Sequence, residues 1–194
     1  NNRLWVGSVN ENASNAYVHS FVPSTGTFTL AATVPLNYAR QAFFGNADSA
    51  GRLSTWHAWS NNPATVVLQT ATAGAEIAYA QPMLSDIEFD CENMILGFRD
   101  RFGDQVGIAT RFRPTDTIDT WGIASGDILR VCWNGTAYVT EGSTGCGTSG
   151  GLVNSGPGGA TSPEHYNWDF GQQSTNPGDS SANSGGFHWE TTQG

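Results

Sequence analysis

Acidic side chains recur at alternate positions near the centre of the chain. Asp86, Glu88 and Asp90 follow one another in steps of two, and Asp100 and Asp104 come one short segment later. In an extended strand, alternate side chains point to one face about 7 Å apart, so the first three carboxylates would form a row. Carboxylate oxygens are the ligands that Ca²⁺ prefers. The five acidic residues are therefore a candidate calcium site.

The same acidic row has two other interpretations. Carboxylates on a solvated strand face need no cation when arginines, here Arg99 or Arg101, pair with them across a hairpin. Two carboxylates could also act as the acid and base of a glycoside hydrolase, but that reaction depends on a separation that a sequence does not contain. Charged residues are mostly exposed, so a solvated strand face is a more common explanation of such a row than a calcium site.

Aromatic residues in polar surroundings form a second candidate site. Tryptophan and tyrosine combine a flat apolar ring with a polar edge, which suits them to stacking against sugar rings. The candidates are Trp56, Trp59, Tyr166 and Trp168. Large aromatic side chains also fill the space between packed β-sheets, and we expect that role for Trp5 and Trp133. Carbohydrate binding and core packing both remain open for the four candidates.

The three cysteines predict one disulfide bond. Cys132 and Cys146 flank a short hairpin, and an odd number of cysteines leaves at least one, here Cys91, free or paired with another chain. Disulfide bonds persist in oxidising compartments, so a bond between Cys132 and Cys146 indicates a secreted or cell-surface protein. The alternative is three buried thiols in a cytosolic protein.

Charge and motif content exclude several classes of function. The chain has no lysine, and its 8 basic residues face 17 acidic ones, which gives a net charge of −9. Nucleic acids and anionic membranes repel such a chain, and no apolar run is long enough to cross a bilayer. The sequence also lacks zinc-ligand histidine spacing, a Gly-x-Ser-x-Gly turn and a phosphate-binding loop. We therefore expect a non-enzymatic protein with no nucleic-acid partner and no membrane insertion.

Strands and tight turns must position these residues. Apolar and polar residues alternate over residues 84–90, 94–99 and 128–133, which is the period of a β-strand. Residues 91–93 are expected to form a turn after the first of these, in which Asn93 is able to take the left-handed conformation. Asn134-Gly135 is a strong hairpin signal before a return strand over residues 136–141. Residues 84–146 are thus predicted to form one complete four-stranded meander, the unit of a β-propeller blade.

Residues 1–83 predict partial blades. The segments 3–9, 16–22 and 27–34 alternate like strands, and a further pair is expected at residues 53–60 and 65–70. The alanine-rich residues 71–80 could instead form one helical turn.

Glycine, serine, asparagine and proline dominate residues 147–186, which we expect to be a long loop region. Residues 187–194 contain a last predicted strand. The expected fold is a single all-β domain over residues 1–194, built from antiparallel four-stranded blades as a partial or small β-propeller. Blade fragments at both ends would leave strand edges exposed, and such edges invite pairing with another chain.

Several long strings resemble a known family. The chain is similar to a propeller-like region of large bacterial surface proteins, which often carry repeated B-type domains of the serine–aspartate-repeat adhesin kind. The strings that carry the resemblance are residues 81–90, 94–105 and 125–130, with weaker support from residues 3–7, 21–28, 156–159 and 188–190. The resemblance implies an extracellular or cell-surface location and a propeller-like fold. The turn that usually carries glycine in that family holds Cys91 here, and the B-type repeats are absent.

The sequence therefore predicts a non-enzymatic extracellular module with a structural or adhesive function. Its expected partners are copies of itself, through exposed strand edges, or surface glycans. The alternative function is a calcium-dependent carbohydrate-binding propeller, and a glycoside hydrolase is a weaker alternative.

Overall fold

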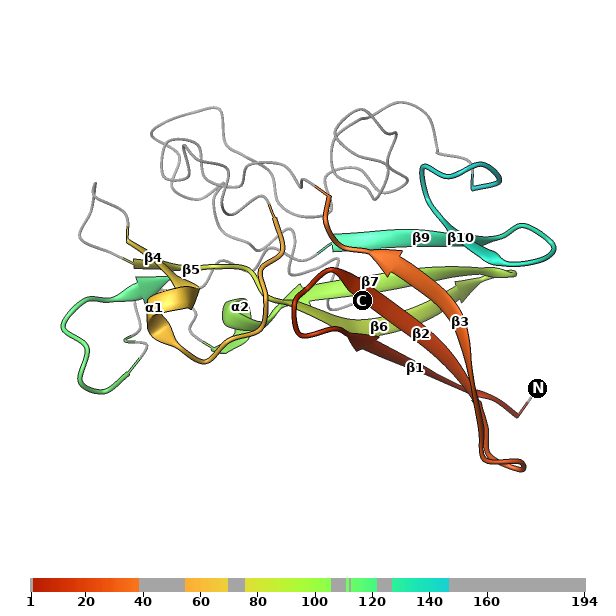
Figure 1. Cartoon of the computed structure of the whole chain (residues 1–194), viewed down its shortest axis with the longest axis horizontal. Coiled ribbons are helices and arrows are strands. Elements are labelled where there is room, and N and C mark those ends of the chain that lie inside the picture. The colour runs from red at the N-terminus through yellow and green to blue at the C-terminus, as the bar shows by residue number, and fades with distance from the viewer. Residues whose placement is uncertain are drawn as a thin grey trace.

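The structure is a computed structural model of the chain. It describes residues 2–38, 55–69, 76–105, 111, 113–121 and 127–146. Within those ranges the chain forms ten β-strands and two short helices, so the expectation of a mostly β protein is confirmed (Figure 1). None of the helices described is long and apolar enough to span a membrane. The predicted loop region 147–186 and last strand 187–194 lie outside the described residues.

The N-terminal strands form a three-stranded antiparallel sheet in the order β1-β2-β3. These strands span Leu4–Val9, Asn15–Val22 and Thr27–Pro35. Alternate residues of β2 are buried, which gives the sheet an inner and an outer face. The three strands predicted from period-two alternation are confirmed, each within one residue of its expected limits.

The central strands form a second antiparallel sheet in the order β10-β9-β7-β6. These strands are β6 at Pro82–Asp90, β7 at Asn93–Asp100, β9 at Asp127–Trp133 and β10 at Tyr138–Thr140. Each strand pairs with the one before it in this set, so the predicted four-stranded meander is confirmed. The stretch between β7 and β9 contains helix α2 at Arg101–Gln105 and strand β8 at Thr120–Trp121.

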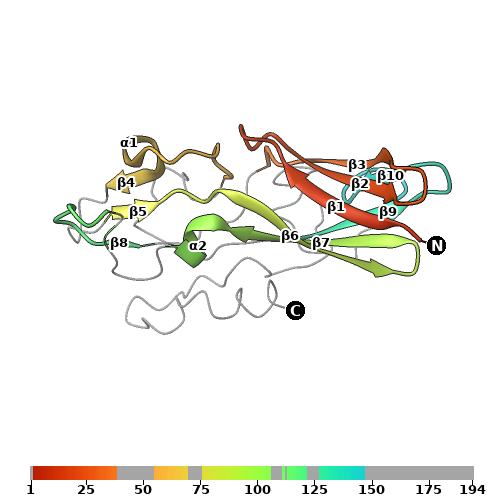
Figure 2. The ribbon, with the colours of Figure 1, turned by 90° about the horizontal axis from the view of Figure 1, so that it is seen from below.

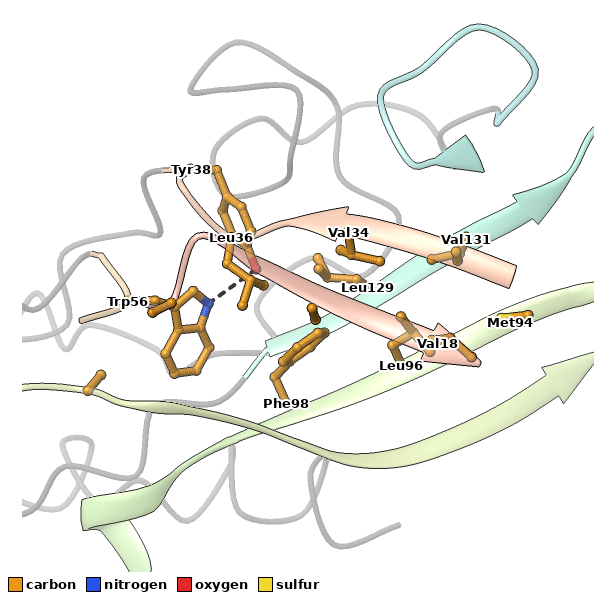
Figure 3. Close-up of a cluster of buried hydrophobic side chains, with 14 residues drawn as sticks. Val18, Val34, Leu36, Tyr38, Trp56, Met94, Leu96, Phe98, Leu129 and Val131 are labelled. Carbon is orange, nitrogen blue, oxygen red and sulfur yellow. Dashed lines mark hydrogen bonds between the residues drawn. The ribbon is translucent and has the colours of Figure 1, made fainter. Parts of the chain in front are cut away.

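The inner faces of the two sheets pack against each other and form the main core. Figure 2 shows the two sheets as adjacent layers, and Figure 3 shows Val18 and Val34 of the first sheet above Leu96, Phe98 and Leu129 of the second. These five side chains are fully buried, and such packing of two apolar faces supplies most of the driving force for folding. The two main sheets of the described residues stack on each other, and no closed ring of blades is seen among those residues.

The two sheets approach most closely along β1 and β6. A Cβ atom added at Gly7 would lie 2.6 Å from Cδ2 of Leu84, which is closer than carbon atoms tolerate. Glycine at this position therefore allows the β1 backbone to lie directly against the side chain of Leu84.

A smaller third sheet has the order β4-β5-β8 and includes a parallel pair between β5 and β8. β4 spans Val67–Gln69 and β5 spans Glu76–Ala78. The short helix α1 spans Pro63–Val66. Asn62 caps its start, because the Asn62 side chain accepts a hydrogen bond from the N–H of Ala64. The predicted strand at residues 53–60 is wrong over its described part, because residues 55–60 are irregular, and residues 76–78 form a strand instead of a helical turn.

The turn between β6 and β7 differs from its prediction. Cys91 has φ of 57° and takes the left-handed conformation, whereas Asn93 is the first residue of β7. A side chain with a Cβ atom costs about 1–2 kcal/mol in this conformation, and glycine avoids the cost.

Replacement of Cys91 by glycine should therefore raise the free energy of unfolding by about 1 kcal/mol. Urea titration followed by circular dichroism measures the change. Cys91→Ala is the matched control, since it removes the thiol but keeps the Cβ atom, and it should leave the stability nearly unchanged. A glycine variant no more stable than the alanine variant would contradict the prediction.

The turn between β9 and β10 is a four-residue loop. Trp133 pairs with Tyr138, so the return strand begins two residues later than predicted. The side-chain oxygen of Asn134 accepts hydrogen bonds from the N–H groups of Thr136 and Ala137 at 3.0 and 2.9 Å, and Gly135 has φ of 93°. Asn134 and Gly135 thus form the turn that the sequence predicts at these residues.

Candidate binding surfaces

The row of acidic residues lies on the outer face of the four-stranded sheet. Asp86, Glu88 and Asp90 occupy alternate positions of β6, opposite the outward-facing residues of β7. One carboxylate oxygen of Asp90 lies 3.3 Å from the guanidinium of Arg130, so an arginine does pair with the row, although it is not one of the two expected. The Asp90 carboxylate is exposed and paired with Arg130, so this end of the row is a solvated strand face.

Asp100 does not join that row. It points to the inner face and is buried, where one carboxylate oxygen accepts hydrogen bonds from the N–H groups of Gln81 and Phe102 at 2.9 and 3.0 Å. Asp100 thereby fixes the start of helix α2, and the side chain of Asp104 lies outside the described residues. Among the described residues no three His, Cys, Asp or Glu side chains are close enough to hold a metal ion. Calcium binding stays a prediction.

The aromatic residues proposed for sugar stacking do not form one platform. Trp56 is in the core, where its indole N–H donates to the hydroxyl of Tyr38 at 3.4 Å, so of the two roles left open for it the structure shows core packing (Figure 3). Trp59 is exposed at one edge, but its N–H donates to the carbonyl of Pro82 at 2.8 Å and Arg101 lies 4.9 Å from its ring centre. Tyr166 and Trp168 lie outside the described residues.

The predicted disulfide bond between Cys132 and Cys146 is confirmed. It links the end of β9 to the segment after β10, with a Cα–Cα distance of 5.2 Å. Cys91 is the free cysteine of the described residues and is exposed. The bond closes a hairpin that is otherwise held by a return strand of three residues.

An open groove lies between the two sheets, at the end where the β6–β7 and β9–β10 turns meet. Its volume is about 780 Å³. Four aromatic side chains line it, and they come from β1, β6, β9 and β10: Trp5, Phe89, Trp133 and Tyr138. We call this feature the aromatic groove. Figure 1 shows that the two turns lie at the same end of the molecule as the start of β1.

The four rings form a connected series. Trp5 lies 5.0 Å from Phe89 and 6.4 Å from Tyr138, and Tyr138 lies 5.0 Å from Trp133, measured between ring centres. Rings at these separations stabilise each other. Phe89 and Trp133 are nevertheless 39% and 36% exposed, so part of their apolar surface faces solvent in the groove.

Polar groups surround the aromatic rings. The charged residues among the lining are Arg3 and Glu92, and the hydroxyl groups come from residues that include Thr29 and Thr136. Burial raises the pKa of the Tyr138 hydroxyl, and the Glu92 carboxylate raises it further, so this hydroxyl keeps its proton at neutral pH. The groove therefore offers apolar faces together with hydrogen-bond donors and acceptors.

Sequence reasoning missed the aromatic groove, since it assigned Trp5 and Trp133 to the core. Trp5 is half-buried and Trp133 is exposed at the end of β9. One available signal was that Phe89 and Trp133 both lie within two residues of a predicted turn, which places them at strand ends. Another was the meander itself, because it brings those two turns to the same end of the sheet.

The outer face of the three-stranded sheet is a second exposed surface. Cross-strand pairing places Leu4, Phe21 and Phe28 in one row, and it places Val6, His19 and Leu30 in the next. The rings of Phe21 and Phe28 are stacked with centres 4.4 Å apart. Leu4, Val6, Phe28 and Leu30 are 57%, 41%, 60% and 53% exposed. We call these two rows the apolar face.

Comparison with known proteins shows that the chain is similar to segments of longer proteins. No protein-family model matches the sequence, and no solved structure matches it. Colossin-A of Dictyostelium discoideum is 33% identical over 136 residues, which are 69% of this chain and 1% of Colossin-A. Colossin-D of the same organism is 29% identical over 181 residues, which are 89% of this chain and 16% of Colossin-D.

The chain thus spans a small part of the length of each of these relatives. The matches extend over most of this chain, and they say what the chain is similar to. The resemblance to bacterial surface proteins stays a prediction, since both relatives come from Dictyostelium.

Proposed function

We propose that this chain is a non-enzymatic, extracellular adhesive module that self-associates through the apolar face. The single observation that carries the proposal is the pair of apolar rows across three strands, with four large side chains more than 40% exposed. Contiguous exposed apolar surface on a soluble protein is typical of an interaction site. The disulfide bond supports an oxidising, extracellular environment.

A second copy of the chain is the occupant that fits this face. The chain carries a net charge of −9, so most pairs of surfaces on two copies repel each other. The two rows contain no acidic residue, whereas the outer face of the other sheet contains Asp86, Glu88 and Asp90. Two apolar faces can therefore meet across a two-fold axis with little electrostatic cost.

This contact continues the packing within the chain, where two meander sheets already stack face to face. We also propose a propeller-like arrangement for this chain. The same stacking supports it, because neighbouring blades of a propeller also pack their sheets face to face. Strand edges are a competing self-association surface, because the edge strands β1, β3 and β6 have 6, 9 and 9 residues, although the edge strand β10 has three. The apolar face is favoured over them because four of its large apolar side chains are more than 40% exposed.

Individual contacts are expected to be weak. Three strands about 4.8 Å apart and about five residues long cover roughly 250 Å², which is below the approximately 800 Å² per partner of a stable interface. A weak contact is adequate for adhesion when many copies act together, because linkage of sites multiplies the effective affinity.

Sedimentation velocity over a concentration series tests self-association. The wild type should sediment as a monomer at about 10 μM and shift toward a dimer near about 1 mM. Phe28→Glu places a charge within each apolar contact and should remain monomeric throughout. Thr115→Glu is the matched control, since it adds the same charge at an exposed loop residue and should associate like the wild type. Equal association of Phe28→Glu and wild type would contradict the proposal.

A further inference from the structure

We propose that the aromatic groove binds neutral carbohydrate. The inference rests on other observations than self-association: the rings of Trp5, Phe89, Trp133 and Tyr138 are not part of the apolar face, and Leu30 borders both surfaces. The aromatic groove combines volume, exposed rings and polar groups.

The rings determine the shape of ligand that the groove accepts. The centres of Trp133 and Tyr138 are 5.0 Å apart, as are those of Trp5 and Phe89, and Trp5 lies 6.4 Å from Tyr138. A pyranose ring has one face of C–H groups that stacks on an aromatic ring and a rim of hydroxyl groups. A volume of about 780 Å³ is enough for a short oligosaccharide with more than one ring.

The polar lining matches the hydroxyl rim of such a ligand. The Arg3 guanidinium donates hydrogen bonds, the Glu92 carboxylate accepts them, and the hydroxyl groups of Thr29 and Thr136 do both. The Tyr138 hydroxyl, which stays protonated, also does both. A purely apolar ligand would leave these groups without partners, so the lining favours a ligand that has hydroxyl groups around an apolar centre.

The charge of the groove favours an uncharged ligand. Arg3 and Glu92 contribute one positive and one negative charge to the described lining, which cancel. The chain as a whole carries −9, so sulfated or sialylated glycans meet a repulsive field on approach. Neutral glycans experience no such penalty.

The groove is suited to binding without hydrolysis. Glycoside hydrolases of the usual kind use two carboxylates that flank the scissile bond. Among the described residues of the lining, Glu92 is the single carboxylate. The bound glycan should therefore be released unchanged.

An array of neutral, sulfated and sialylated oligosaccharides, probed with the fluorescently labelled protein, tests the inference. The wild type should bind members of the neutral group, with and without a calcium chelator. Trp133→Ala should lower the affinity for the strongest neutral glycan at least about tenfold, which corresponds to a loss of about 1.4 kcal/mol. Trp133→Phe, which keeps an aromatic ring, should retain most of the binding.

Phe28→Ala is the matched control, because it removes another exposed aromatic ring that lies outside the aromatic groove. It should bind like the wild type, and circular dichroism should show that all variants are folded. The inference would be overturned by no signal on any neutral glycan, by preference for sulfated or sialylated glycans, or by unchanged binding by folded Trp133→Ala. Loss of binding with chelator would instead favour the calcium-dependent alternative and would also overturn the inference as stated.

Discussion

Replacement of Phe98 by alanine should lower the free energy of unfolding by about 4 kcal/mol. Phe98 is fully buried, lies on the inner face of β7 and contacts the Trp56 ring at a centre-to-centre distance of 6.4 Å (Figure 3). Its removal loses the transfer energy of a large aromatic side chain and leaves a cavity between two sheets that cannot easily collapse. Urea titration monitored by tryptophan fluorescence and by circular dichroism measures the loss.

Phe28→Ala is the matched control for that experiment. It is the same substitution at a phenylalanine that is 60% exposed on the outer face of the first sheet, and it should cost less than about 1 kcal/mol. Comparable losses for the two variants would show that the sheets do not pack with Phe98 between them.

Removal of the disulfide bond should have the second largest effect. The double variant Cys132→Ser/Cys146→Ser should lose about 3 kcal/mol, because the bond restricts a loop with a sequence separation of 14 in the unfolded chain. Both cysteines are buried, so the serine hydroxyls add a further cost. The wild type titrated with urea in the presence of a reductant should lose the contribution of the bond alone, about 3 kcal/mol.

Cys91→Ser is the control for the cysteine variants, since Cys91 is exposed and outside the bond. Its stability should respond to reductant as the wild type does, whereas the double variant should show no response. A wild type with identical unfolding midpoints in oxidant and reductant would contradict the assigned contribution of the bond.

The strands of the two main sheets could be predicted from local alternation, because each sheet has one buried and one exposed face. Met94, Leu96 and Phe98 share the inner face of β7, and the same parity places Asp100 inside. Asp100 was expected beside Asp90 because the acidic residues were grouped by their nearness in the sequence, without regard to the face of the sheet that each one occupies. The pairing of Cys132 with Cys146 was predictable because both flank one short hairpin.

The two binding surfaces depend on contacts that local patterns do not contain. The aromatic groove needs Trp5 of one sheet to meet Tyr138 of the other, and these residues are far apart in sequence. The apolar face requires the register that aligns Phe21 with Leu4 and Phe28, including an irregularity between Val18 and His19. Such an irregularity reverses which side chains point outward, so the alternation of β3 alone does not predict that Leu30 is exposed.

Clumping of protein-coated beads tests the adhesive function most directly. Beads that carry many copies of the wild type should aggregate when they are mixed, because multivalency strengthens a weak contact between apolar faces. Beads coated with Phe28→Glu at the same density should stay dispersed, and beads coated with Thr115→Glu should clump like the wild type. If wild-type beads stay dispersed, or if Phe28→Glu beads clump equally, the apolar face is not an adhesive surface and the proposed function is wrong.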